Sequence, residues 1–360
     1  MRLITMRIVA AVAAAAVVAV SACTTSQPSP ASVLSSAAPS LPGNVPAYYV
    51  VVAGLDVVVR ASADGHVTGS VAIPVPAGTP RAFAGATVFG GLDDRHFVVI
   101  ASRGGDLPGV ETATLFLLTL SSDGRPGRLH RLAFDNQGMP VTGASLSPDG
   151  MTVVLSLTNE VPGQEQYGSV VLINAATGAT RTWTGEAAPG YWPGVPSWAG
   201  DGTVEVPWWH GGSAETVPAS LTGVRELNLA SPGGSLLAAQ LVTYQAPVLD
   251  LGSALIAPGS GYVVASSCRA GPGRHSGTAQ IIELDPATGR VVEIMRTQTT
   301  RFGNNADVQD AIDSTCRVLS PVDGGGLVLT QAFAFGRIDD GVFTSLPGTS
   351  PHVLPVSAAW

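Results

Sequence analysis

Short apolar runs, many of them β-branched, alternate with turns rich in Gly, Asp and Pro from residue 47 onward. The runs are too short for helices, and several show the period of two that is typical of strands. One part of this pattern recurs as an apolar segment, a turn that carries Gly, and another apolar segment. The turn glycines recur at intervals of 54–59 residues and are Gly65, Gly124, Gly178, Gly233 and Gly289. Each is predicted to lie at the bend of a hairpin.

A second turn and a further strand precede most of these hairpins. The predicted strands are Phe97–Ala101, Thr152–Ser156, Val204–Val206, Tyr262–Ala265 and Leu327–Thr330. Three or four strands in each repeat are typical of a β-propeller blade. We therefore expect an all-β propeller of six blades, with seven blades as the alternative and a ring-closing strand around His352 to Val356. A pair of β-sandwich domains is the third interpretation, which is disfavoured because the repeat continues through the middle of the chain.

Two segments carry a family resemblance. Leu146–Val154 reads LSPDGMTVV and Pro196–Gly202 reads PSWAGDG. They resemble the SPDG and P-x-W-S-P-D-G turns of TolB-like, WD-repeat-like propellers, although only one SPDG turn is intact. The similarity extends over residues 48–346 and implies a propeller fold without assigning an activity. In these turns, Asp149 and Asp201 are expected to accept hydrogen bonds from nearby backbone.

The first 22 residues have the order of a secretory signal. Arg2 and Arg7 precede an apolar run from residue 8 to residue 20, and the run is shorter than the roughly 20 residues of a membrane-spanning helix. The segment that ends at Cys23 resembles the lipobox of bacterial lipoproteins. That resemblance implies that Cys23 is lipidated and holds the protein on the extracytoplasmic face of the cell membrane. An ordinary cleaved signal peptide and an uncleaved anchor are the alternatives.

Residues 23–46 consist almost entirely of Ser, Thr, Pro, Ala, Gln and Gly, which cannot bury a core. We interpret them as a disordered tether and residues 47–360 as the propeller domain.

The charged residues exclude several functions. The chain has 18 Arg, no Lys and 26 acidic residues. The absence of Lys excludes lysine Schiff-base chemistry and a P-loop lysine. The negative net charge of −8 disfavours nucleic acid as a partner. This composition indicates a high-GC genome, such as that of an actinobacterium. We expect no cofactor and a monomer.

Cys268 and Cys316 are the two cysteines that remain once Cys23 is set apart. In an exported protein such a pair favours a disulfide over a metal site or a nucleophile. The bridge would stabilise the fold by roughly 4 kcal/mol if it acts through chain entropy.

Aromatic residues gather in one region, since five of the six Trp lie between residues 183 and 209. Its densest groups predict a surface for a sugar ring or an apolar peptide side chain, formed by Tyr191, Trp192, Trp208, Trp209 and His210. The alternative is that these rings pack in the core. Because neighbours in a strand point to opposite faces, we expect one of Trp208 and Trp209 to face solvent or a groove.

The remaining candidates are weaker. Asp307, Asp310 and Asp313, with Asn304, have the oxygen ligands that Ca²⁺ prefers, but the D-x-D-x-D-G loop is absent and a solvated acidic helix is favoured. The histidines occur singly, outside any catalytic motif, at His66, His96, His130, His210, His275 and His352. We predict no catalytic residue. The expected function is non-catalytic binding of a protein, peptide or cell-wall glycan, and the alternative is a propeller hydrolase or lyase acting on envelope glycans or lactones.

Overall fold

In the computed structural model, contacts within the chain set residues 39–360 apart as the second of two units. The structure describes parts of the second unit, namely residues 46–74, 84–90, 93, 95–104, 111–159, 167–199, 202–211, 219–248, 251–257, 261–270, 276–301, 317–322, 325–329, 335–339, 342–346 and 357–360. Within these ranges, every regular element is a strand except one 3₁₀ turn, η2 (Leu236–Ala238). The all-β fold class is therefore confirmed.

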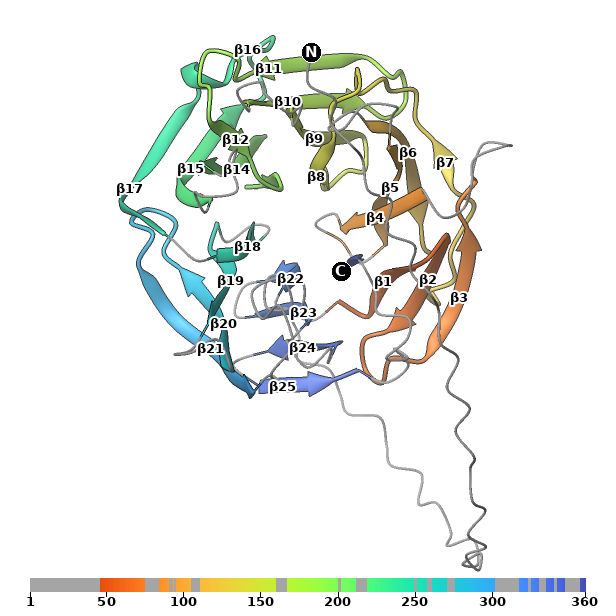
Figure 1. Ribbon diagram of the computed structural model, residues 1–360. Coiled ribbons are helices and arrows are strands. Elements are labelled where there is room, and N and C mark those ends of the chain that lie inside the picture. The colour runs from red at the N-terminus through yellow and green to blue at the C-terminus, as the bar shows by residue number, and fades with distance from the viewer. Residues whose placement is uncertain are drawn as a thin grey trace, which may run out of the picture. The chain divides into compact units, whose positions relative to one another are not determined.

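Four sheets have four antiparallel strands each (Figure 1). The first sheet contains β26 (Ser357–Ala359), β1 (Tyr48–Ala53), β2 (Asp56–Ala61) and β3 (Val67–Ala72). The second contains β4 (Ala84–Gly90), β5 (His96–Gly104), β6 (Glu111–Thr119) and β7 (His130–Arg131). The other two contain β18 (Leu251–Ile256), β19 (Val263–Ala270), β20 (Ser276–Leu284) and β21 (Val291–Arg301), and β22 (Arg317–Val322), β23 (Gly325–Leu329), β24 (Phe335–Asp339) and β25 (Val342–Ser345).

The fifth sheet has ten strands. One part of it is an antiparallel run of β8 (Val141–Leu146), β9 (Thr152–Asn159), β10 (Tyr167–Asn174) and β11 (Thr180–Thr184). A second part contains β12 (Tyr191–Pro193), β13 (Ser197–Trp198), β14 (Thr203–His210), β15 (Ser220–Asn228) and β17 (Gln240–Val248). Two parallel contacts join the parts, one between β10 and β12 and one between β11 and β16 (Gly234–Ser235).

The sheets follow one another around a common centre, with one strand of each sheet near the centre and the last strand at the outside (Figure 1). Contacts between sheets close this ring. The second sheet contacts β8, the ten-stranded sheet contacts β18, and β18 contacts β22. Finally β22 contacts β26, and β26 contacts β4. The propeller-like arrangement expected from the repeat is therefore confirmed.

Inner strands are joined by the same hydrogen bond at three successive boundaries. The hydroxyl oxygens of Ser253, Ser320 and Ser357 each accept a backbone N–H from the next sheet, at 3.0 Å. The donors are Val318, Trp360 and Val88. As predicted, a strand from the end of the chain completes the first sheet. It comprises Ser357–Ala359, whereas the proposed segment around His352 to Val356 lies outside the described residues.

The predicted hairpin bends are confirmed. The five turn glycines all have positive φ, which favours Gly over other residues, with values between 69° and 110°. They lie in the connections that follow β2, β6, β10, β15 and β20. The SPDG turn also forms as expected, because the Asp149 carboxylate accepts hydrogen bonds from the Ser147 hydroxyl and from the Met151 N–H at 2.9 Å. Asp201 lies outside the described residues.

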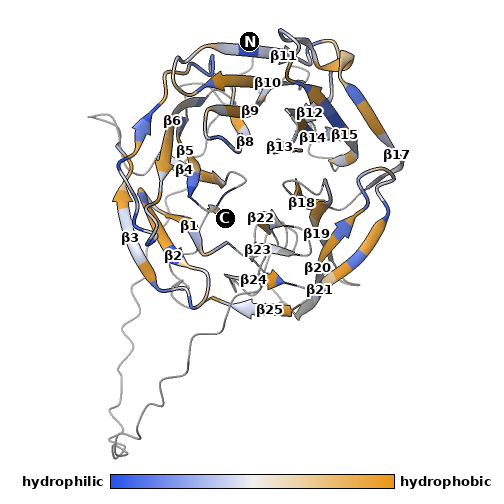
Figure 2. Cartoon of the chain, turned by 180° about the vertical axis from the view of Figure 1, so that it is seen from behind, coloured by the Kyte–Doolittle hydropathy of each residue, from blue (hydrophilic) through white to orange (hydrophobic). Residues whose placement is uncertain are grey.

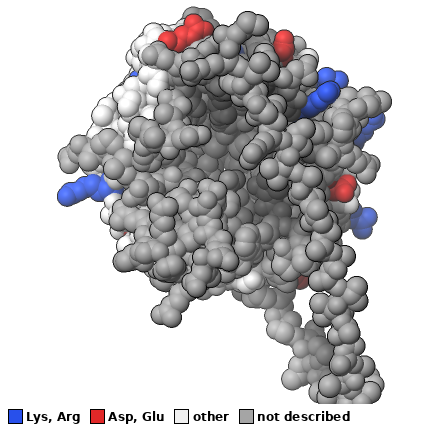
Figure 3. Space-filling model, in the orientation of Figure 1, with Lys and Arg blue, Asp and Glu red and all other residues white. Residues whose placement is uncertain are grey.

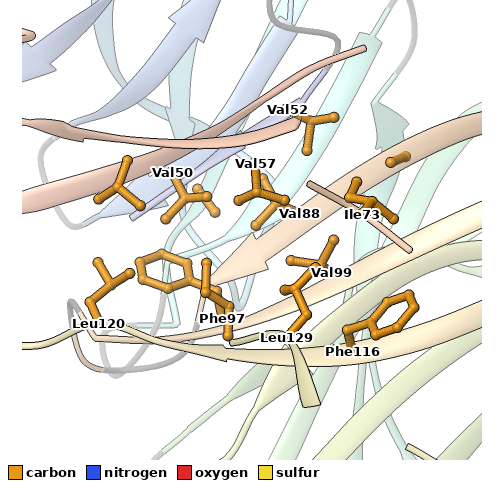
Figure 4. Packing of buried hydrophobic residues seen from close by; sticks show 14 residues of the cluster. Val50, Val52, Val57, Ile73, Val88, Phe97, Val99, Phe116, Leu120 and Leu129 are labelled. Carbon is orange, nitrogen blue, oxygen red and sulfur yellow. The ribbon is translucent and has the colours of Figure 1, made fainter. Parts of the chain in front are cut away.

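The core lies between sheets, so both faces of a sheet are buried. In β1, Val50 and Val52 pack with Phe97 and Phe116 of the second sheet (Figure 4). The alternate residues Tyr49 and Val51 pack on the other face with Leu327 and Trp360. This packing explains the continuous apolar runs in the sequence, because a strand covered on both faces does not need polar alternation. Hydrophobic residues run along the strands, while many hydrophilic ones occupy their ends (Figure 2).

Among the described residues, no helix has the length and apolar character needed to cross a membrane.

Candidate functional site

The predicted aromatic residues lie on two neighbouring strands of the ten-stranded sheet. Strands β12 and β14 are antiparallel, and their register pairs Tyr191 with His210, Trp192 with Trp209, and Pro193 with Trp208. The structure therefore brings together all five residues that the sequence singled out, although Trp192 and Trp208, the nearest members of the two groups, are 16 positions apart.

One face of this strand pair carries a column of stacked groups. The Tyr191 and Trp208 ring centroids are 5.9 Å apart, with planes 11° apart. The centroid of the His210 imidazole lies 4.2 Å from that of Tyr191, with the two planes tilted by 37°. The Arg225 guanidinium lies 4.4 Å from the Trp208 ring centroid, within cation–π range. The column therefore runs from the exposed His210 to the buried Arg225.

Arg225 anchors the inner end of the column and was not singled out from the sequence. Its residue is only 5% exposed, and burial lowers the pKa of its guanidinium. Its Nη1 donates to the backbone carbonyls of Leu236 and Ala239, at 3.0 and 3.1 Å. Its place beside the apolar Val224 could have indicated burial from the sequence. A buried cation needs hydrogen-bond acceptors such as these two carbonyls.

The opposite face of the strand pair is also covered. Trp209 is 8% exposed and packs with Leu221 and Ile256, while Trp192 packs against the same cluster and stays partly exposed. The backbone at Gly194 passes close to the Trp209 indole, since a Cβ added to Gly194 would lie 2.8 Å from the Trp209 Nε1.

The expectation that Trp208 or Trp209 faces solvent or a groove is wrong. Trp208 is 2% exposed and Trp209 is 8% exposed. They do point to opposite faces, as neighbours in a strand must. However, each face of this sheet packs against apolar residues, those around Trp183 and Leu227 on one side and those around Ala254 and Ile282 on the other.

The accessible part of the group consists of Tyr191, Trp192 and His210, which we call the aromatic edge. It continues along the end of the sheet, because the strand register places Asn159, Tyr167, Tyr191, His210 and Ser220 in one row across five strands. The Ser220 hydroxyl donates to the His210 carbonyl at 3.2 Å. The row lies at the end of the sheet from which the connections 160–166 and 211–219 leave.

Two acidic residues face each other on β14 and β15. The register places Glu205 directly opposite Glu226. Burial, and then the charge of Glu226, raise the pKa of Glu205. The Glu205 carboxylate lies against the turn before β19, where a Cβ added to Gly261 would be 3.3 Å from its Oε2. Like charges in this position are unfavourable.

The other candidate residues stay apart. His66 and His96 each contact an Asp of their own turn, Asp64 at 2.7 Å and Asp93 at 2.6 Å. Within the described part of the chain, no three His, Cys, Asp or Glu residues form a group able to hold a metal ion. On the face drawn in Figure 3, the described charged side chains are separated around the periphery. The proposed calcium ligands Asn304, Asp307, Asp310 and Asp313 lie outside the described residues, as do His275, His352, Cys23 and Cys316.

No protein-family model matches the sequence, and no curated protein matches it. Solved structures resemble this chain in the arrangement of their strands but have low sequence identity to it. An apocarotenoid oxygenase from Synechocystis is 10% identical over 86% of this chain and 73% of its own, with a TM-score of 0.41. Dipeptidyl peptidase 4 from Porphyromonas gingivalis is 13% identical over 86% of this chain and 53% of its own, with a TM-score of 0.38. The GH43 protein BlXynB from Bacillus licheniformis is 13% identical over 74% and 58%, with a TM-score of 0.37.

Proposed function

We propose that this protein is a lipid-anchored, extracytoplasmic propeller that works as a monomer and binds a protein, peptide or cell-wall glycan without chemical turnover. The observation that carries this proposal is the aromatic edge. Its outer groups are accessible, whereas Trp208 and Arg225 beneath them are buried and fixed.

A rigid base makes such an edge suited to binding. Tyr and Trp supply large contact areas with few rotatable bonds, so little side-chain entropy is lost when a ligand covers them. Stacking on Trp208 already restrains Tyr191, and packing beside Trp209 restrains Trp192. The apolar C–H face of a sugar ring or an apolar side chain of a peptide would contact these rings, and the ring nitrogens of His210 add a hydrogen-bonding group.

We further propose that the propeller has six blades of the TolB-like type. Besides the four separate sheets, the ten-stranded sheet contains two antiparallel runs of four strands each. One run is β8, β9, β10 and β11, and the other is β13, β14, β15 and β17. The intact SPDG turn between β8 and β9 supports the resemblance.

The anchor and the disulfide belong to the same proposal. Lipidation of Cys23 would hold the domain at the membrane through residues 24–46, and a Cys23→Ser variant should leave the membrane fraction. The neighbourhood of the cysteines supports a bridge. Ser253 Oγ accepts from the Val318 N–H and lies 2.9 Å from Ser266 Oγ. Cys268 follows Ser266 by two positions, and Cys316 precedes Val318 by two.

The binding role can be tested with the full-length protein. Ligands are selected on it from a phage-displayed peptide library and from an array of peptidoglycan fragments. Affinities for the selected ligands are then measured for Tyr191→Ala, Trp192→Ala and His210→Ala. We expect losses of about tenfold or more for the two aromatic substitutions, since aromatic anchors carry much of the affinity in such contacts.

His130→Ala is the matched control, because His130 is an exposed strand histidine of another sheet. If all variants bind with the affinity of the wild type, the ligand contacts another surface and the proposed role of the aromatic edge is overturned. Turnover of a glycan or lactone by the wild type would replace binding with catalysis.

A further inference from the structure

A cavity of about 310 Å³ lies between the two parts of the ten-stranded sheet, away from the aromatic edge. Its walls come from β11, β14, β15, the segment that joins β15 to β17, and the first residue of β17. The lining residues are Trp183, Thr203, Glu226, Leu227, Asn228, Ser231, Gly233, Ser235, Ala238, Ala239 and Gln240.

The cavity exists because the connection 229–239 folds back over its own sheet. Most other described connections of this kind are shorter hairpin turns, such as 62–66 and 175–179. Here Gly234 and Ser235 form β16, which pairs in parallel with Trp183 and Thr184 of β11. The close approach requires glycine at Gly233, where φ is 110° and an added Cβ would lie 2.6 Å from the Thr182 carbonyl oxygen.

Two arginines hold this connection in place, Arg181 from β11 and Arg225 from β15. The Arg181 Nη1 donates to the carbonyls of Leu229 and Ser231, at 2.5 and 3.0 Å. Arg225 binds the carbonyls at the two ends of η2, as described above. The Ser235 hydroxyl accepts the Leu237 N–H at 3.2 Å and caps this turn. The cavity wall is therefore fixed before any ligand arrives, which lowers the entropic cost of binding.

The lining chemistry favours a neutral, polyhydroxylated ligand. Thr203, Asn228 and Gln240 offer hydroxyl and amide groups that both donate and accept hydrogen bonds. Trp183 supplies one apolar wall. No arginine is among the described lining residues, whereas the acidic residue Glu226 is, so the lining disfavours a phosphate or a carboxylate. A wholly apolar ligand would leave the polar groups unpaired.

We propose that this cavity binds one neutral sugar residue. Its volume lies at the small end of ligand sites, which suits a single ring rather than an extended chain. The site is separate from the aromatic edge. Thr203 and His210 occupy the two ends of β14, and seven steps along a strand span about 23 Å.

The test uses the full-length protein in a detergent that lacks a sugar headgroup. Glucose, N-acetylglucosamine and rhamnose, with inorganic phosphate for comparison, are titrated by isothermal calorimetry and by ligand-observed saturation-transfer NMR. We expect at least one sugar to bind and phosphate not to bind. Thr203→Val and Gln240→Ala should each weaken sugar binding about tenfold, through the loss of one hydrogen-bonding group.

A cavity-filling pair provides the steric test. Ala238→Phe should abolish sugar binding, because Ala238 lines the cavity, whereas Ala176→Phe in an exposed turn of the same sheet should not change it. Tyr191→Ala should also leave it unchanged, which separates this site from the proposed function. Absence of sugar binding, preference for phosphate, or equal affinities of the Ala238 and Ala176 variants would overturn the proposal.

Discussion

The hydroxyl of Ser357 makes two hydrogen bonds to the backbone of Val88, accepting its N–H and donating to its carbonyl, both at 3.0 Å. The two residues are 269 positions apart in the sequence. Ser357 belongs to β26 and Val88 to β4, so one side chain satisfies two backbone groups across the boundary where the ring closes.

Removing this hydroxyl should weaken the ring. We expect Ser357→Ala to lower the free energy of unfolding by about 1–3 kcal/mol, because two partly buried backbone groups lose their partner. Urea denaturation followed by tryptophan fluorescence measures the change. Ser345→Ala, at an exposed position of β25, serves as control and should change stability by no more than about 0.5 kcal/mol. Equal effects of the two substitutions would show that Ser357 does not lock the ring.

The two tryptophans of different exposure should separate stability from binding. Trp208→Ala should lower the free energy of unfolding by about 3–5 kcal/mol, because Trp208 is 2% exposed and its loss leaves Arg225 without its ring contact. Trp192→Ala should cost less, since part of its ring is exposed. Thermal and urea unfolding of both variants tests this order. The reverse order would contradict the assignment of Trp208 to the core.

Replacing Glu205 should stabilise the protein at neutral pH. Burial and Glu226 raise the pKa of Glu205, so the folded protein binds this proton more tightly than the unfolded chain does. The ionised carboxylate therefore opposes folding at high pH, and this cost falls as the pH drops through the raised pKa. Glu205→Gln should increase the free energy of unfolding by about 0.5 kcal/mol at pH 7.

The gain should shrink on acidification and vanish below the ordinary pKa of 4.5, where the group is protonated in both states. Unfolding curves recorded between pH 4 and pH 8 measure it. Glu186→Gln, at an exposed position, is the control. A gain that grows on acidification would have the wrong sign.

The cysteine pair makes a chemical prediction. The hydrogen bonds among Ser253, Ser266 and Val318 hold β18, β19 and β22 together close to Cys268. We expect Cys268 and Cys316 to resist alkylation in the native protein until a reductant is added. Reduction should lower the free energy of unfolding by up to about 4 kcal/mol. Two thiols that react without reductant would exclude the bridge, and Cys268→Ser would then be as stable as the wild type.

Local signals explain what could be predicted. The sequence predicted the bends at Gly65, Gly178 and Gly289 and the apolar strands beside them. Turn residues and β-branched runs determine such elements within a few positions of the chain. The burial of Trp208 and Trp209 depends on what packs against each face of β14, and neighbouring sheets supply that packing. The adjacency of Trp208 and Trp209 in a strand could show that their rings point to opposite faces of the sheet. It could not show that neighbouring sheets cover both of these faces.

The site beyond the aromatic residues required contacts between distant segments. The pairing of Tyr167 with Tyr191 joins two parts of a sheet through one parallel contact, which has no sequence signature. The cavity beside Trp183 likewise depends on a connection that crosses to β11. Gly233 was predicted as a bend from its spacing, yet spacing could not reveal that the bend lies against Thr182.

The position of β26 has a consequence for biogenesis. The first sheet needs residues 357–359 beside β1, so it stays incomplete until the last strand has been synthesised. During translation the free edge of β1 is therefore open to pairing with other chains. Closure of the ring therefore joins two segments that are about 300 residues apart, so contacts between near neighbours in the sequence cannot complete the first sheet.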